Sequence, residues 1–374
     1  MNGGFLIPVL RDGEAATRLS PRAWEQLLKE ARAPMLIAHL ALQSRDQGWN
    51  DRIPTQPRRH LEAARRSCVS QQQMVRWEVD HIERALAGLG APVVLLKGAA
   101  YVMAGLPVAG GRFFSDIDIM VPRDCLERAE AALIPHGWIS NVHGYDRRYY
   151  EEWSHELPPL QHVQRASVID LHHTITPPAS RTPVEATKLF AAARPLEGSK
   201  VFRILAPTDM LLHSAVHLMQ EGEFEVGLRG LVDLDALCRD FGRDPEFWPA
   251  LVDRASEHGL GRILYYAVQQ ARSLLGTPVP LDFHSAINGF RPFFVTRGAM
   301  NALLGAALAG APARGQSRKV AVSRWLLYVR AHYMRMPLRF LIPHLIRKSG
   351  SRLASLGRRR SAQSIPVGGA RIAQ

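Results

Sequence analysis

Two aspartates, two positions apart, have the types and spacing best suited to chemistry. Asp116 and Asp118 lie in Phe113–Val121, where polar and apolar residues alternate as in a β-strand. Side chains at this spacing share a face, so we expect the carboxylates to lie close together, with Ile117 and Ile119 in the core. Binding Mg²⁺ relieves the repulsion between paired carboxylates. The alternative is an exposed edge strand carrying two solvated acids.

A third carboxylate sits in a second apolar segment, Ala166–His173, which also predicts a strand. Asp170 lies between Ile169 and Leu171, and a lone carboxylate buried there needs a partner or a metal to offset its desolvation. Three acids on neighbouring strands suit a two-metal site for phosphoryl transfer. The alternative is an Asp170 that caps a turn near the end of this strand.

The segments around these acids alternate between strand and helix patterns, which predicts an α/β unit. In chain order we expect a strand at 91–96 with a sharp turn at Lys97-Gly98, a helix at 99–104, a strand at 113–121, a helix at 124–136, and strands at 137–139 and 166–173. Helical periodicity covers 21–90, with an interruption at Pro54 and Pro57 before a second stretch from Val69 to Leu89, and it returns after Pro207.

Composition excludes several classes of protein. The chain has 374 residues with 47% hydrophobic and 22% charged, so wholesale disorder is excluded and more than one packed unit is expected. Cys68, Cys125 and Cys238 lack any paired spacing, which argues against zinc ribbons and disulfide scaffolds. They fit a reducing compartment, and no convincing targeting or spanning segment is present, so a cytoplasmic location is expected.

The net charge of +13 is concentrated at the C-terminus. Residues 312–374 contain 14 Lys and Arg and no Asp or Glu, whereas the residues before them carry 33 basic and 34 acidic side chains. A basic tail is attracted to an anionic membrane surface or another polyanion. For Trp325–Ile346 we favour a last core helix with a basic solvent face, and the alternative is a segment that lies on an anionic membrane surface. The neutral body argues against a long nucleic acid as substrate.

The motifs together resemble a known family. Leu96–Gly98, Gly111-Arg112, Ser115–Val121 and Val168–His172 are similar in order and spacing to the uncharacterised bacterial nucleotidyltransferase-like family of the DNA polymerase beta superfamily. In that superfamily a glycine turn after the first strand precedes a strand with two metal-binding acids, and a third acid lies on a later strand. The resemblance is strong over Ala91–Pro177.

This resemblance implies a nucleotidyltransferase fold of the α+β class, with a mixed sheet flanked by helical units. The implied domains are an N-terminal helical unit at 1–90, the nucleotidyltransferase-like domain at 91–200, a helical domain at 201–311 and a basic, partly disordered segment at 312–374. The implied reaction is attack by an acceptor hydroxyl or amine on the α-phosphorus of a nucleoside triphosphate such as ATP, with release of pyrophosphate. The acceptor and the oligomeric state are not readable from the sequence.

The resemblance also assigns roles to residues. It makes Asp116, Asp118 and Asp170 the catalytic ligands of Mg²⁺ or Mn²⁺, and it assigns nucleotide binding to Lys97, Gly98, Arg112 and Ser115. His172 shares a strand face with Asp170 and either moves a proton or orients a carboxylate.

One departure from the superfamily pattern concerns the glycine turn. Gly98 is followed by Ala99 instead of serine or glycine, and the paired acids come 18 positions after Gly98. Lys97 or Arg112 would then supply positive charge to the triphosphate. The alternatives are a lysine that extends to solvent and an arginine paired with a nearby acid.

Two other functions remain open. A glycosyltransferase would use Asp116 and Asp118 to hold a nucleotide sugar, but this leaves Lys97-Gly98 and Asp170 without a role. A catalytically degenerate fold kept as a binding module is the second. His213 and His217 have helical spacing but lack the glutamate of a zinc-hydrolase motif, so zinc is not predicted there.

Overall fold

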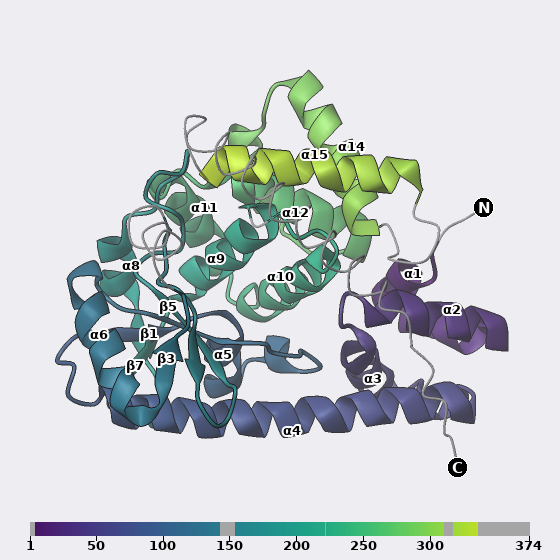
Figure 1. Ribbon diagram of the computed structural model, residues 1–374. Coiled ribbons are helices and arrows are strands. Elements are labelled where there is room, and N and C mark those ends of the chain that lie inside the picture. The colour runs from purple at the N-terminus through teal and green to yellow at the C-terminus, as the bar shows by residue number, and fades with distance from the viewer. Residues whose placement is uncertain (1–3, 143–153, 221, 310–316, 336–374) are drawn as a thin grey trace, which may run out of the picture.

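The computed structural model describes residues 4–142, 154–220, 222–309 and 317–335. Within these residues seven strands form one mixed sheet in the order β3-β4-β5-β2-β1-β7-β6, with helices packed around it (Figure 1). This confirms the expected α+β class. The strands are β1 (Val93–Leu95), β2 (Ile117–Met120), β3 (Trp138–Ser140), β4 (Leu160–His162), β5 (Val168–His172), β6 (Arg194–Pro195) and β7 (Phe202–Ile204).

Helices make up most of the remaining structure. The α-helices are α1 (Leu6–Arg11), α2 (Pro21–Arg32), α3 (Ile37–Asp46), α4 (Thr55–Leu86), α5 (Lys97–Met103), α6 (Leu126–Leu133), α8 (Ala186–Ala192), α9 (Pro207–Gln220), α10 (Gly227–Phe241), α11 (Phe247–Glu257), α12 (Gly261–Leu275), α13 (Leu281–Ile287), α14 (Phe294–Ala309) and α15 (Arg318–Arg335). Short 3₁₀ turns are η1 (Gly13–Arg18), η2 (Asn50–Arg52), η3 (Pro107–Ala109), η4 (Arg123–Cys125), η5 (Ile134–His136) and η6 (Asn288–Phe290). None of these helices is long and apolar enough to cross a membrane.

Helix α4 is the long base of the molecule in Figure 1, where it extends beneath both the sheet and the N-terminal helices. It contacts α3 at one end and α5 and α6 at the other. Helix α9 lies above the sheet, against α5, and α15 lies above α9. The sheet is therefore covered on both faces, and the strands β1 and β2 are buried throughout, as expected for a central pair.

The order of the central strands fixes the geometry of the candidate acids. Strand β2 pairs in parallel with β5 and antiparallel with β1, and the register sets Asp118 opposite Asp170. Residues opposite each other on neighbouring strands have side chains on the same face of the sheet. These two carboxylates therefore project from adjacent strands toward α9.

Strand and helix boundaries differ from expectation in two places. Strand β2 begins at Ile117, not at Phe113, because the backbone N–H and C=O of Phe114 are hydrogen-bonded to the side chain of Gln71 on α4. The prolines do not delay the second N-terminal helix to Val69, since α4 begins at Thr55. Pro57 lies in the first turn, where a missing N–H is tolerated.

Three strands were not expected at all: β4, β6 and β7. Each has only two or three residues, too few to show an alternating pattern. The domain boundaries at 90, 200 and 311 remain predictions. All three cysteines are buried and free.

A buried ion pair joins the loop before β2 to helix α10. Arg112 Nε donates a hydrogen bond to Asp233 Oδ2 over 2.9 Å, and both side chains are about nine-tenths buried. The guanidinium also lies over the rings of Tyr101 and Phe114. Asp235, two positions further along α10, pairs separately with Arg239.

Removing one partner of this pair should be costly. Asp233→Ala leaves the Arg112 charge buried without its carboxylate, so we expect a loss of about 3–5 kcal/mol in the free energy of unfolding, measured with urea. Asp240→Ala is the control, because its partner Arg243 is exposed and surface pairs contribute about 1 kcal/mol or less. Equal losses in the two variants would contradict a structural role for the buried pair.

Candidate active site

The three predicted acids come together at the centre of the sheet. Asp118 and Asp170 are register partners, and Asp116 lies two residues before Asp118, immediately ahead of β2. Burial, followed by the charges of Asp118, Glu156 and Asp116 in that order, raises the pKa of Asp170 to about 7. Asp116 and Asp118 thus each lie near enough to Asp170 to repel its charge, while the mutual repulsion of Asp116 and Asp118 remains a prediction.

Asp118 is the most buried of the three, with 3% of the residue exposed. Its Oδ1 accepts hydrogen bonds from Lys97 Nζ at 2.9 Å and from His172 Nε2 at 3.0 Å. Burial alone would raise the pKa of Asp118, but the Lys97 charge and the His172 hydrogen bond hold it well below its usual range. Asp118 is therefore an anion at neutral pH.

Lys97 reaches Asp118 from a strained backbone position. It is the first residue of α5 and has a φ of 43°, which is uncommon for a residue with a side chain. The next residue must be glycine, because a Cβ on Gly98 would overlap the Arg112 guanidinium and the Phe114 ring. The Lys97-Gly98 turn thus positions the Lys97 ammonium group beside Asp118. Gly98 allows the Arg112 and Phe114 side chains to pack closely against the turn.

Asp170, unlike Asp118, has a buried carboxylate oxygen, Oδ1, that no hydrogen-bond donor contacts in the described residues. A buried carboxylate oxygen without a donor is costly unless it is protonated or bound to a cation. Together with Asp116, it offers the type of carboxylate oxygen that Mg²⁺ prefers. The oxygens of Asp116, Asp118 and Asp170 do not all lie within 4.8 Å of one another, so the side chains would have to move closer together to share an ion.

The other predicted nucleotide ligands lie in different settings. Ser115 is exposed, and its Oγ donates a hydrogen bond to Asp116 Oδ1 at 2.9 Å. Arg112 is held by Asp233, so it shows the pairing with a nearby acid that the sequence left open. Of the predicted cations, Lys97 is the one in direct contact with a predicted acid in the described residues.

The sequence did not indicate His155 and Glu156, which join the site from the segment before β4. Glu156 forms an isolated antiparallel bridge with His172, and its Oε2 lies 3.5 Å from His172 Nδ1. No periodic pattern marks this segment, because a single bridge is too short to produce one.

A narrow polar cavity adjoins Lys97 beneath α9 and α15. Its lining includes His155, His213 and His217, together with Gln220 and Arg335. Burial, followed by the nearby charge of Lys97, lowers the pKa of His213 well below its usual value, so this imidazole is neutral. The cavity offers hydrogen-bond donors and positive charge next to the acids.

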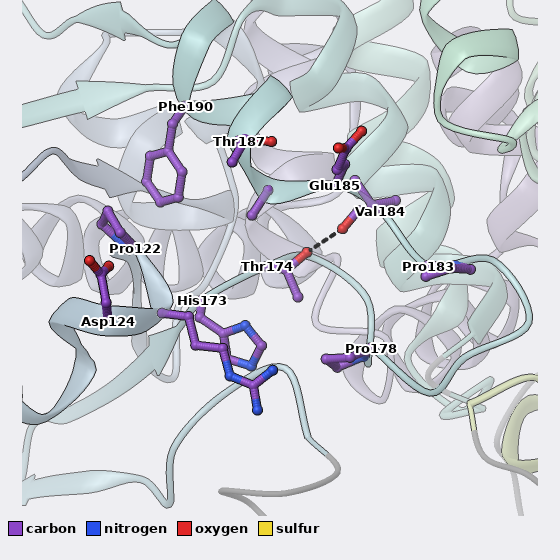
Figure 2. A pocket seen from close by; sticks show the side chains of 12 residues that line it. Pro122, Asp124, His173, Thr174, Pro178, Pro183, Val184, Glu185, Thr187 and Phe190 are labelled. Atoms are coloured by element: carbon purple, nitrogen blue, oxygen red, sulfur yellow. Dashed lines mark hydrogen bonds between the residues drawn. The ribbon is translucent and has the colours of Figure 1, made fainter.

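A wider pocket of about 730 Å³ lies beyond the C-terminal ends of β2 and β5 (Figure 2). His173 lines this pocket, whereas His172 contacts Asp118, as neighbouring strand residues face opposite ways. Figure 2 shows Phe190, Pro122 and Pro178 around the opening, and Thr174 Oγ1 donating to the carbonyl of Val184. The pocket is mainly apolar and is separate from the acids.

Comparison with known protein families identifies the family of this chain. A model of the uncharacterised nucleotidyltransferase family matches residues 20–276, more than half of the chain. The chain therefore belongs to this family, and it is a nucleotidyltransferase by class, as its motifs predicted. No curated protein and no solved structure matches it.

The raised pKa of Asp170 predicts a pH-dependent stability. Without divalent cations, native Asp170 binds its proton more tightly than the unfolded chain does, so its ionisation costs stability as pH rises from about 4 to about 7. Asp170→Asn carries no such cost. We expect the free energy of unfolding of the variant, minus that of the wild type, to grow across this range by at most about 1.4 kcal/mol per pH unit.

Urea unfolding at several pH values with a chelator present measures this difference. Asp80→Asn on the exposed side of α4 is the matched control. A difference that stays constant or shrinks from pH 4 to pH 7 would contradict the raised pKa.

Proposed function

We propose that this chain transfers a nucleoside monophosphate from a nucleoside triphosphate to an acceptor hydroxyl or amine, with Mg²⁺ or Mn²⁺ as cofactor and pyrophosphate as product. The observation that carries the proposal is the pairing of Asp118 with Asp170 on adjacent strands, with Asp116 just ahead of β2 and with Asp170 Oδ1 buried and lacking a donor among the described residues. Membership of the nucleotidyltransferase family supports the reaction class.

The three aspartates would hold the metal. Asp116 and Asp118 would share it, and Asp170 would complete the position nearest the acceptor, as the family resemblance implies. When bound, the metal neutralises phosphate charge and lowers the pKa of the attacking group. The buried strands fix the carboxylates before substrate arrives, so little reorganisation is needed.

Lys97 and His172 would prepare Asp118 for this role. Both contact the same oxygen, Oδ1, which fixes the orientation of the carboxylate. Lys97 also supplies positive charge at the edge of the polar cavity, where a phosphate chain would need it. His172 is buried against Asp118 and acts on the reaction through it, as a positioning residue.

The polar cavity, at about 10 Å³, is too small to hold a triphosphate, so its side chains would contact the phosphates only after the cavity opens. Lys97 and Arg335 provide cations on its wall, and His213 and His217 project into it from one side of α9. A neutral His213 imidazole is able to donate one hydrogen bond to a phosphate oxygen.

Incubation of the full chain with α-labelled nucleoside triphosphates and Mg²⁺ tests the proposal. We expect pyrophosphate release and transfer of label, and we expect Asp116→Asn to reduce the rate on the order of 10³-fold or more, because metal stabilisation of the transition state is worth several kcal/mol. Asp80→Asn, an exposed change on α4, should leave the rate unchanged.

Two outcomes would overturn the assignment. Consumption of nucleotide sugars but not triphosphates would favour a glycosyltransferase that uses Asp116 and Asp118. Binding of Mg²⁺ and triphosphate without pyrophosphate release across a panel of acceptors would favour a degenerate binding module, a candidate that the Lys97–Asp118 ion pair supports by occupying one acid.

The structure describes only part of the basic C-terminal segment. Residues 336–374, which hold most of the basic tail, lie outside the described residues. Within the described part, α15 exposes Val322, Trp325 and Leu326 among its arginines. Contact of this segment with an anionic membrane surface or another polyanion remains a prediction.

A further inference from the structure

We propose that His155, Glu156 and His172 form a binding site for a Zn²⁺-type divalent cation, beside the three aspartates and distinct from them. Each residue offers one ligand atom, and the three atoms all lie within 4.8 Å of one another. This site would bind its cation whether or not the aspartates carry out nucleotidyl transfer.

The spacing of the ligand atoms suits tetrahedral coordination. Glu156 Oε2 lies 3.5 Å from His172 Nδ1 and 3.8 Å from His155 Nε2. A tetrahedral site with metal–ligand bonds of about 2.0–2.2 Å has ligand atoms about 3.3–3.6 Å apart. Small side-chain rotations are therefore enough to close the three ligands around one cation.

The backbone holds the three residues together independently of their side chains. Glu156 and His172 form an antiparallel bridge. On either side of it, Leu157 N–H donates to the Leu171 carbonyl at 2.8 Å and His173 N–H donates to the His155 carbonyl at 2.9 Å. The segment 155–157 is thus fixed against β5, and the ligand set is preorganised.

His172 supplies the second observation that points to a ligand. It is 1% exposed, and its Nε2 is bonded to Asp118 Oδ1. Its Nδ1 is buried, faces Glu156, and has no hydrogen-bond partner in the described part of the chain. A histidine with one nitrogen on a carboxylate and the other turned toward a cluster of ligands has the orientation of a metal-bound histidine.

The donor set selects the type of cation. Two imidazole nitrogens and one carboxylate oxygen suit Zn²⁺, whereas Mg²⁺ prefers oxygen ligands alone. Three protein ligands leave a fourth position for water or a substrate atom, as in catalytic zinc sites. The charges of Asp118 and Asp170 nearby add to the attraction for a cation.

Zinc titration of the chelator-stripped, full-length chain tests this site, with Co²⁺ as a spectroscopic substitute. We expect one cation to bind with the visible absorption of tetrahedral Co²⁺. Glu156→Gln and His155→Gln should weaken Zn²⁺ binding about 100-fold or more, since even indirect ligand contacts are worth 10–100-fold. His284→Gln is the matched control, a half-buried histidine on α13 outside the cluster.

The proposal is wrong if both variants bind Zn²⁺ as tightly as the wild type, or if the wild type binds no Zn²⁺. The three residues would then form an ordinary ion-pair network. Glu156→Gln keeps the shape of the side chain, so thermal unfolding of the stripped protein should match the wild type and exclude misfolding as the cause.

Asp116→Asn separates this site from the proposed active site. We expect this variant to lose nucleotidyl transfer and to retain wild-type Zn²⁺ affinity. Loss of Zn²⁺ binding in Asp116→Asn would place the cation among the aspartates and overturn the proposal. A wild type that binds Zn²⁺ as expected but releases no pyrophosphate would overturn the proposed function and support this site.

Discussion

Repulsion between carboxylates crowded at the middle of a small sheet is the constraint on which the rest of the site depends. Asp118 and Asp170 are register partners on adjacent strands, and the charges of Asp116 and Glu156 also act on Asp170. Lys97 and His172 both hydrogen-bond to Asp118. The unbalanced charge is carried by Asp170, whose pKa rises to about 7.

Rigid packing around the acids holds them close together despite their repulsion. Parallel pairing of β2 with β5 fixes the distance between the acids at about the spacing of neighbouring strands, roughly 4.8 Å. Buried residues of β1 and β2 anchor the sheet on both faces. The Arg112–Asp233 pair holds the loop before β2 against α10, so Asp116 cannot move away from its neighbours without breaking a buried contact.

The acids were predictable from sequence because their signals are local. The alternation around Asp116 and Asp118, and the apolar run around Asp170, identify strands and faces without knowledge of distant residues. The family pattern in turn identified Lys97 and Gly98. The family pattern did not show that Lys97 pairs with Asp118. That contact depends on the unusual backbone conformation of Lys97, which side-chain patterns do not encode.

Contacts between distant segments were beyond local patterns. Arg112 and Asp233 are 121 positions apart, and Gln71, 43 positions from Phe114, delays the start of the expected strand. Glu156 reaches His172 through one bridge. In each case the decisive partner lies on another element, and a single sequence does not show which elements meet.

Helix α15 contributes one wall of the polar cavity. This helix lies outside the region that the family model matches, which ends at residue 276. Arg335 reaches this wall from the last turn of the helix, and Arg181 fastens that turn by bonding the carbonyls of Tyr333 and Met334. Shortening this chain before α15 would therefore remove one wall of this cavity as well as the basic tail.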